Sequence, residues 1–309
     1  MIRRVAAIDC GTNSIRLLVA DVDTDGGTLV DLDRRMEIVR LGHGVDSTGR
    51  LSDEALARTF DACDRYAEVL RDLGAQRVRF VATSASRDAE NRDDFVRGVL
   101  ARIGVEPEVV SGDEEARLSF TGATRGLTGA QPPYLVVDIG GGSTEFVVGT
   151  DEPLAARSVD IGCVRLTERH LRSDPPSRAE VAALIADADA AIALAGEAVP
   201  FADARTLVGL AGSVTTAAAL ALGLEQYDPV AIHGARISAA AVAGVSDRLL
   251  ASTHAERSSV AVIHPGRLDV LNAGILVLRR ILDLTGLPEV LVSEHDILDG
   301  IALSVAERL

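Results

Sequence analysis

The chain has 309 residues, 47% of them hydrophobic and 25% charged, which is ordinary for a globular protein and long enough for about two domains. Its net charge is −15 and all 31 basic residues are arginine, so we expect no general affinity for nucleic acid, no P-loop lysine and no Schiff-base chemistry. No apolar run reaches the roughly 18 residues of a membrane span and the N-terminus resembles no signal peptide, so we expect a cytoplasmic protein without membrane contacts.

The first part of the chain alternates between predicted strands and helices. VAAIDCGTNSIRLLVADVD is a strand ending near Asp9, a polar turn and a second strand, and a third apolar run follows near VDLDRRMEIVRLG. LSDEALARTFDACDRYAEVLRDLG is a helix that Ser52 caps and Gly74 ends. RVRFVATSASRDAEN is a strand leading into a polar turn at Thr83 and Ser84. NRDDFVRGVLARIG is a helix, VEPEVVSG a short strand, and DEEARLSFTGATRGL a helix with three acids in its first turn.

RGLTGAQPP is the best linker candidate, so we predict domains at 1–128 and 129–309, with the last helix able to pack back on the first domain. YLVVDIGGGSTEFVVG then reads as two strands around a glycine turn, and SRAEVAALIADADAAIALAGEAV as a long helix. TLVGLAGSVTTAAALALG is a strand, a glycine turn and a helix. Helices are predicted over about 237–284 with a break at 264–266, and EVLVSEHDILDGIALSVAERL gives a strand and a helix. This alternation predicts an α/β fold with helices packed on sheet faces.

The glycine turn has a counterpart near the N-terminus. Aligning Asp9 on Asp138, an offset of 129 residues, also pairs Gly11 with Gly140 and Ser14 with Ser143. Such an offset is too long for a solenoid repeat and indicates a duplicated domain. Glycine turns let phosphate oxygens approach backbone amides, so two such hairpins facing each other across a cleft would hold a phosphate chain from both sides. The alternative interpretation is that both glycine segments are ordinary tight turns with no role in phosphate binding.

Several polar groups next to these turns suit phosphate chemistry. Asp113, Glu114 and Glu115 either complement a helix dipole or include a general base that orients water. Asp138 and Glu145 either cap a turn or ligate Mg²⁺. The remaining candidates are Asp9 as the matching metal carboxylate, Arg87 as a phosphate clamp or a surface ion pair, Gly212 and Ser213 as an anion site where a strand meets a helix, and, less strongly, Arg16, Arg165 and Arg267.

The motifs AAIDCGTNSIRLLVA, ATSASRDAEN, VVSGDEEARLSF, LVVDIGGGSTEFVVG, IGCVRLTERHL, GLAGSVTTAAAL and VLVSEHDILDGIA occur in this order along the chain. Together they resemble the Ppx/GppA phosphatases, which are exopolyphosphatases and guanosine pentaphosphate phosphohydrolases of the actin, Hsp70 and sugar-kinase superfamily. The resemblance implies two ribonuclease-H-like domains around a cleft, a requirement for Mg²⁺ (with Mn²⁺ as the alternative ion), and a homodimer. It also implies that the C-terminal HD-type domain of longer members is absent, which would affect the preferred length of the substrate.

The same resemblance assigns roles to individual residues. It implies that Glu115 is the catalytic base and that Asp138 and Glu145 are the metal-associated acids. The residues that it implies for phosphate binding are Asn13, Ser14, Arg87, Gly141, Gly142 and Ser143.

The resulting hypothesis is Mg²⁺-dependent hydrolysis of the terminal phosphoanhydride of inorganic polyphosphate. The nearest alternative is removal of the 5′-terminal phosphate of guanosine pentaphosphate (pppGpp), which is the same reaction on another substrate. A non-catalytic sensor of polyphosphate or an alarmone is a second class. A sugar or acetate kinase is a third, but it conflicts with the pairing of Glu115 and Glu145, because a kinase must exclude water rather than activate it.

Overall fold

The structure, a computed structural model, describes residues 1–23, 28–75 and 77–307. It divides into two compact units, which we call unit 1 (Met1–Gly122 together with α13, Ile297–Glu307) and unit 2 (Ala123–Asp296). The division between the units falls between Gly122 and Ala123, in the last turn of α5 (Gly112–Thr124), whereas the sequence predicted 128/129; α5 ends directly before the Gly- and Pro-rich segment. The final helix α13 packs on strands of unit 1.

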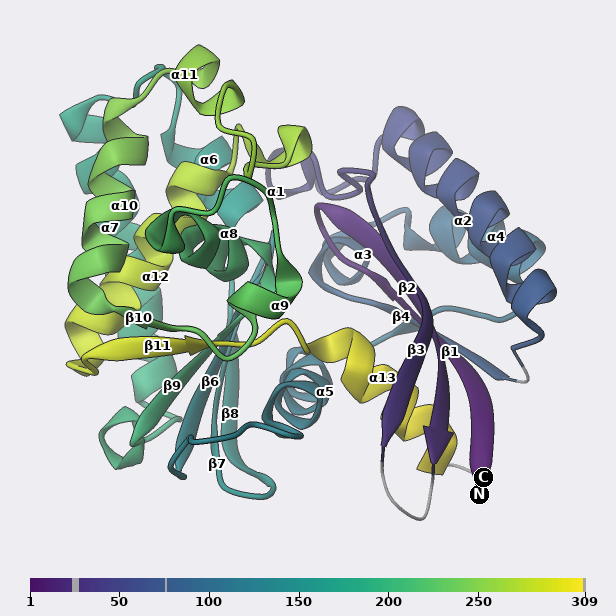
Figure 1. Ribbon diagram of the computed structural model, residues 1–309. Coiled ribbons are helices and arrows are strands. Elements are labelled where there is room, and N and C mark those ends of the chain that lie inside the picture. The colour runs from purple at the N-terminus through teal and green to yellow at the C-terminus, as the bar shows by residue number, and fades with distance from the viewer. Residues whose placement is uncertain (24–27, 76, 308–309) are drawn as a thin grey trace. The chain divides into compact units, whose positions relative to one another are not determined.

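Unit 1 is built on a five-stranded sheet in the order β3-β2-β1-β4-β5 (Figure 1). The first three strands form an antiparallel meander, and β4 and β5 run parallel to β1. Successive residues of β1 point to opposite faces and both faces are buried, which explains its nearly continuous apolar sequence. The strands are β1 (Ile2–Cys10), β2 (Ser14–Asp23), β3 (Leu29–Ile38), β4 (Arg77–Ala82) and β5 (Glu108–Val109).

Helices cover the two faces of this sheet. One face packs against α2, whose predicted ends are confirmed: the Ser52 hydroxyl accepts a hydrogen bond from the Ala55 amide, and Gly74 ends the helix with φ 65°. On the other face lie α13 and α5, in close contact because a Cβ on Gly300 would stand 2.0 Å from the Leu118 carbonyl oxygen. The further helices are α1 (Val45–Thr48), α2 (Asp53–Leu73), α3 (Ser84–Asp88) and α4 (Arg92–Ile103).

Unit 2 repeats the strand arrangement of unit 1 with one strand added. Its six-stranded sheet has the order β10-β11-β9-β6-β7-β8, in which β6, β7 and β8 are antiparallel and β9 and β11 run parallel to β6. The segment β8-β7-β6-β9-β11 thus corresponds to β3-β2-β1-β4-β5, as the duplication predicts. The strands are β6 (Tyr134–Ile139), β7 (Thr144–Gly149), β8 (Pro153–Val159), β9 (Thr206–Leu210), β10 (Arg236–Ser238) and β11 (Glu289–Val292).

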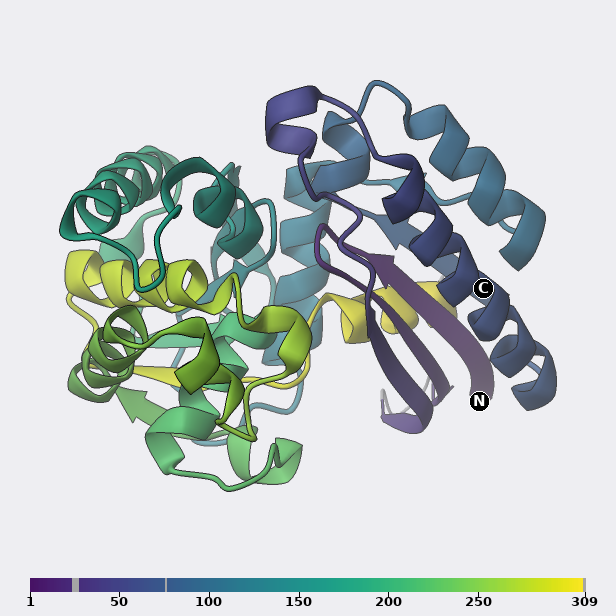
Figure 2. The same cartoon turned by 90° about the horizontal axis from the view of Figure 1, so that it is seen from above.

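One face of this second sheet forms a single core with helices α7, α8, α10 and α12 (Figures 1 and 2). Helix α12 packs against α6, α7, α8 and α10. The helices are α6 (Cys163–His170), α7 (Arg178–Gly196), α8 (Ala211–Leu222), α9 (Pro229–Ile232), α10 (Ala239–Ala251), α11 (His254–Ser258) and α12 (Leu271–Thr285). In the described residues no helix is long and apolar enough to cross a bilayer.

Three local predictions need correction. The polar turn predicted at Thr83 and Ser84 is the start of the short helix α3. No glycine turn separates β9 from α8, because Ala211 bends the chain with φ 65° and the helix begins at once. The region 237–284 contains α10, α11 and α12, with β10 beginning just before it, and the expected break at 264–266 is a 3₁₀ turn over Pro265–Arg267.

Candidate active site

The two glycine turns are closed by the same backbone hydrogen bond. The amide of Gly11 donates to the carbonyl oxygen of Ser14 at 2.9 Å, and the amide of Gly140 donates to that of Ser143 at 3.1 Å. These are the residues that the offset of 129 pairs in sequence. The alignment of the two hairpins is therefore confirmed at the level of individual hydrogen bonds.

In the turn of unit 2, every glycine carbonyl is already used. The amides of Cys163 and Val164, at the start of α6, donate to the carbonyl oxygens of Gly140 and Gly141, both at 2.9 Å. The Arg165 side chain, one of the weaker candidates from the sequence, donates from Nε to the Gly142 carbonyl oxygen at 2.7 Å and so supports the turn. A Cβ on Gly162 would lie 2.4 Å from the backbone of Gly141, which shows how closely α6 approaches.

The amides of this turn, in contrast, are unused. In the described part of the chain, the N–H groups of Gly141, Gly142 and Ser143 donate no hydrogen bond, although Gly142 and Ser143 are buried. Buried backbone donors nearly always have a partner, so the two buried unpaired donors of Gly142 and Ser143, next to the unpaired Gly141, need an explanation. With the carbonyls turned to α6, the turn presents only donors, as an anion-binding backbone does.

The turn of unit 1 shows the same division of donors and acceptors. The carbonyl oxygen of Thr12 accepts from the Gly42 amide, and that of Asn13 accepts from the amides of Val39 and Arg40. No residue that the structure describes accepts from the amides of Thr12 and Asn13, and the buried Oδ1 of Asn13 also lacks a partner there. Two turns far apart in sequence thus have free amides and occupied carbonyls.

Glu115 and Arg87 lie together in unit 1. Arg87, in the last turn of α3, places Nη1 3.3 Å from Oε2 of Glu115 and 3.2 Å from the Val110 carbonyl oxygen. The Glu115 side chain is 10% exposed and that of Arg87 27% exposed, so both interpretations of Arg87 have a basis: it forms an ion pair, and part of its side chain remains accessible.

The three acids at the start of α5 have different surroundings. Glu114 pairs with the buried Arg79 at 2.6 Å, and Asp113 is exposed. Glu115 alone is buried next to Arg87. Among the three acids it therefore best fits a catalytic role.

Asp138 and Glu145 face each other directly across β6 and β7, and both are buried. Oε1 of Glu145 accepts a hydrogen bond from the Ser158 hydroxyl at 2.7 Å. Like charges directly opposite one another destabilise a sheet, so a divalent cation bound there would relieve this cost. The described residues include no cluster of three or more carboxylate, imidazole or thiolate groups suited to a metal ion. Mg²⁺ fits this donor set, because it is often held by one or two carboxylates with substrate phosphates and waters.

Asp9 has different surroundings from its counterpart Asp138. Its Oδ2 accepts from Nε of Arg16 at 3.0 Å and from Nη2 at 2.6 Å, and Arg16 occupies the position that Glu145 has in the second copy. The aspartate of unit 1 is thus balanced by an arginine, whereas that of unit 2 faces a second carboxylate. The case for a metal-binding pair rests on Asp138 and Glu145, and the assignment of Asp9 stays a prediction.

Gly212 and Ser213 form the tightly packed start of α8. A Cβ on Gly212 would lie 1.7 Å from Nη1 of Arg267, so only glycine lets this guanidinium approach the helix. The Ser213 hydroxyl is packed in the same way against Gly274 of α12. Arg267 was only a weak candidate site residue in the sequence analysis. Its contact with Gly212 joins segments more than fifty residues apart, which the sequence does not reveal.

Three hydroxyl groups of unit 1 near these turns were not among the predicted site residues. The Thr12 and Ser84 hydroxyls are 2.9 Å apart, so the turn after β1 contacts the start of α3. In addition, the buried Ser86 hydroxyl has no hydrogen-bond partner among the residues described. Thr12 lies within GTNS and both serines within ATSAS, but nothing in the sequence distinguishes these hydroxyls from those of an ordinary polar turn.

Comparison with known proteins gives the same family as the sequence motifs. The model of the Ppx/GppA phosphatase family matches residues 18–309. The chain belongs to this family. It is 51% identical to Exopolyphosphatase 2 of Mycobacterium tuberculosis over 98% of each chain. The crystal structure of an exopolyphosphatase-like protein superposes with a TM-score of 0.96 at 43% identity, covering 99% of this chain and 98% of that one.

A second named activity occurs among its relatives. The guanosine-5′-triphosphate,3′-diphosphate pyrophosphatase of Photobacterium profundum is 39% identical over 54% of this chain and 33% of its own length. The chain is thus similar to proteins that are named for two different phosphoanhydride substrates, polyphosphate and guanosine-5′-triphosphate,3′-diphosphate.

Proposed function

We propose that this phosphatase-family protein is an exopolyphosphatase that hydrolyses the terminal phosphoanhydride of inorganic polyphosphate and releases orthophosphate. The observation that carries the proposal is the set of unused amides at Gly141, Gly142 and Ser143, whose neighbouring carbonyls are all occupied. Phosphate oxygens are acceptors only, so they match a turn that offers only donors. The relative named Exopolyphosphatase 2, at 51% identity, supports the choice of polyphosphate.

In the proposed reaction, Glu115 takes a proton from water as the water oxygen bonds to the terminal phosphorus. The bridging P–O bond breaks, and the shortened polyphosphate leaves with the bond's electron pair. Arg87 holds the Glu115 carboxylate through their ion pair and contributes positive charge for a phosphate oxygen. Catalysis of this kind depends on positioning and on compensation of negative charge.

The proposed metal ligands are Asp138 and Glu145, with Mg²⁺ as the expected ion and Mn²⁺ as the alternative. The ion would supply positive charge to phosphate oxygens. Asn13, Ser14, Gly212 and Ser213 are proposed to contribute to phosphate binding.

We also propose that the protein is a cytoplasmic homodimer that binds neither membranes nor nucleic acid. The three cysteines are buried and unpaired, which suits a reducing compartment. The net charge of −15 disfavours a nucleic-acid surface. Sedimentation equilibrium of the purified protein would test the dimer, and a single species of 32.4 kDa would refute it.

The test of the proposed function is phosphate release by the purified protein with Mg²⁺ on short polyphosphate, long polyphosphate and pppGpp, with EDTA controls. A higher kcat/KM on polyphosphate supports the proposal, and the ratio of short to long substrates gives the length preference. Release mainly from pppGpp would establish the alternative that the Photobacterium relative suggests. Binding of all three without release would indicate a sensor.

A further inference from the structure

A cavity of about 350 Å³ lies in unit 2, away from the residues discussed above. It is lined by the C-terminal end of α8, the last turn of α10, α11 and the segment that follows it. Gly212 lies in the first turn of α8 and Gly223 caps its end, so the rise of the helix separates the proposed phosphate site from the cavity by about 16 Å. The cavity is therefore a separate feature at the opposite end of the same helix.

The cavity wall is mostly apolar. Its hydrophobic residues are Leu220, Leu224, Leu249, Val260 and Val262. Leu249 and Val262 are buried, whereas Val260 is 36% exposed, which places it toward solvent. A wall of this kind does not suit polyphosphate, which would lose its hydration without gaining partners, but it suits an apolar body.

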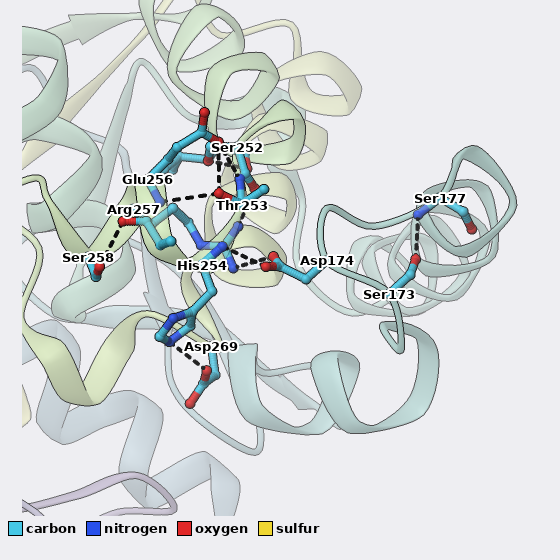
Figure 3. A network of polar contacts seen from close by, with 12 residues as sticks. Ser173, Asp174, Ser177, Ser252, Thr253, His254, Glu256, Arg257, Ser258 and Asp269 are labelled. Carbon is cyan, nitrogen blue, oxygen red and sulfur yellow. Dashed lines mark hydrogen bonds and ion pairs between the residues drawn. The ribbon is translucent and has the colours of Figure 1, made fainter.

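The α11 side of the cavity is held by a network of polar contacts (Figure 3). Asp174, in the loop before α7, accepts from Nη2 of Arg257 at 2.9 Å and from the His254 amide at 2.6 Å. Thr253 and Glu256 form a capping box, which engages the Glu256 carboxylate. This side of the wall is thus preformed: both oxygens of Asp174 and the Oε2 of Glu256 accept hydrogen bonds within it.

Two arginine side chains at the cavity have unused donors. Arg248 lines it from α10 and makes no hydrogen bond or ion pair with any residue in the described ranges. Arg257 is 5% exposed, and its buried Nε has no acceptor there. The carbonyl of Ser252 already accepts from Arg257, and the Ser252 hydroxyl donates to Leu249. A ligand that complements this wall must present acceptors.

The dipole of α8 opposes the binding of an anion in this cavity. The C-terminal end of a helix carries roughly half a negative charge, which would favour a cation. However, the last turn of α8 is closed by the Gly223 amide, which donates to the carbonyls of Ala219 and Leu220. Glu256 also brings a negative charge to the wall, but its Oε2 accepts from the amide and hydroxyl of Thr253 at the start of α11, whereas Arg248 has no partner in the described ranges. The charge of Arg248 therefore favours an anion.

From these observations we propose that the cavity binds a small amphipathic anion, with an apolar body against the leucine and valine wall and a single anionic group at Arg248. A cavity of 150 Å³ holds benzene, so this one has room for roughly ten to fourteen heavy atoms. A medium-chain carboxylate has the required size and charge. The proposal does not depend on which substrate the phosphatase hydrolyses.

Octanoate is the probe, and isothermal titration calorimetry on the full chain measures its affinity. We expect hexanoate to bind about fifteenfold more weakly, since each buried methylene contributes about fourfold, or ~0.8 kcal/mol. Acetate and octylammonium should show no binding up to about 10 mM. Absence of octanoate binding in that range, or equal binding of octanoate and octylammonium, would overturn the proposal.

Three variants locate the site. Arg248→Ala should weaken octanoate about fivefold or more and leave the affinity for 1-octanol unchanged. Arg178→Ala is the matched control, because Arg178 is an exposed arginine of unit 2 that makes no pair in the described residues and does not line the cavity. Val260→Trp should block both ligands, with Leu224→Phe as a second filling variant if the first does not fold. Unchanged octanoate affinity in Arg248→Ala, or in a folded filling variant, would refute the assignment.

Discussion

Replacing Glu115 by glutamine separates catalysis from binding at the proposed active site. The amide keeps the size of the carboxylate and an oxygen that can accept from Arg87, but it cannot take a proton from water. General-base catalysis contributes typically 10²–10⁴-fold, so kcat should fall by about that factor. Loss of an ion pair at 3.3 Å, with Arg87 27% exposed, should lower the free energy of unfolding by only about 1 kcal/mol.

The assay is phosphate release under saturating polyphosphate, with binding measured separately on the same preparation. Glu114→Gln is the control, because Glu114 lies next in the chain and also pairs with an arginine, Arg79, but its side chain is 42% exposed. Its kcat should stay within about twofold of the wild type. If Glu115→Gln keeps its kcat, or loses binding together with turnover, Glu115 is not the general base.

Three further predictions concern the proposed metal-binding carboxylates, the start of α8 and the loop before α7. Asp138→Asn should abolish Mg²⁺-dependent activity and raise the stability of metal-free protein by about 0.2–1 kcal/mol, because a like-charge pair is removed; unchanged activity would exclude this ligand. Gly212→Ala should displace Arg267, lower stability by about 1–3 kcal/mol and raise KM for polyphosphate, and an unchanged urea midpoint would contradict that contact. Hydrogen bonds from Ser173 and Ser177 lower the pKa of Glu180 from 4.5 to about 2, so its stabilising contribution is present above pH 4.5 and lost as the pH falls toward 2. Glu180→Gln should flatten this part of the urea-denaturation profile, and an unaltered profile would refute the assignment.

Structural features that depend on a few neighbouring residues were predictable from the sequence. The ends of α2 follow from Ser52 and Gly74, since a cap and a left-handed glycine act within a few residues. The duplication was also predictable, because the same residue types recur at one offset. The left-handed Ala211 was not, since alanine has no preference for that conformation and tertiary packing imposes it.

Contacts between distant segments account for most of what the sequence did not reveal at the site. Arg87 and Glu115 were both candidates, but only the fold shows that they form a pair. The turn presents donors because Arg165 and the start of α6 donate hydrogen bonds to its carbonyl oxygens, and these groups lie more than twenty residues away in sequence. No residue pattern within the turn itself records that arrangement.

The two hairpins share one structural feature and differ in another. Both retain free amides and occupied carbonyls, which is the property that suits phosphate, and both keep an aspartate at the end of the first strand. The residue opposite that aspartate differs: Arg16 in unit 1 and Glu145 in unit 2. In unit 1 the chain itself supplies a cation opposite the aspartate, whereas the two buried carboxylates of unit 2 are the ones that we propose to bind a divalent ion. This one difference in charge between the two copies is the reason that the proposal places the divalent ion in unit 2 and not in unit 1.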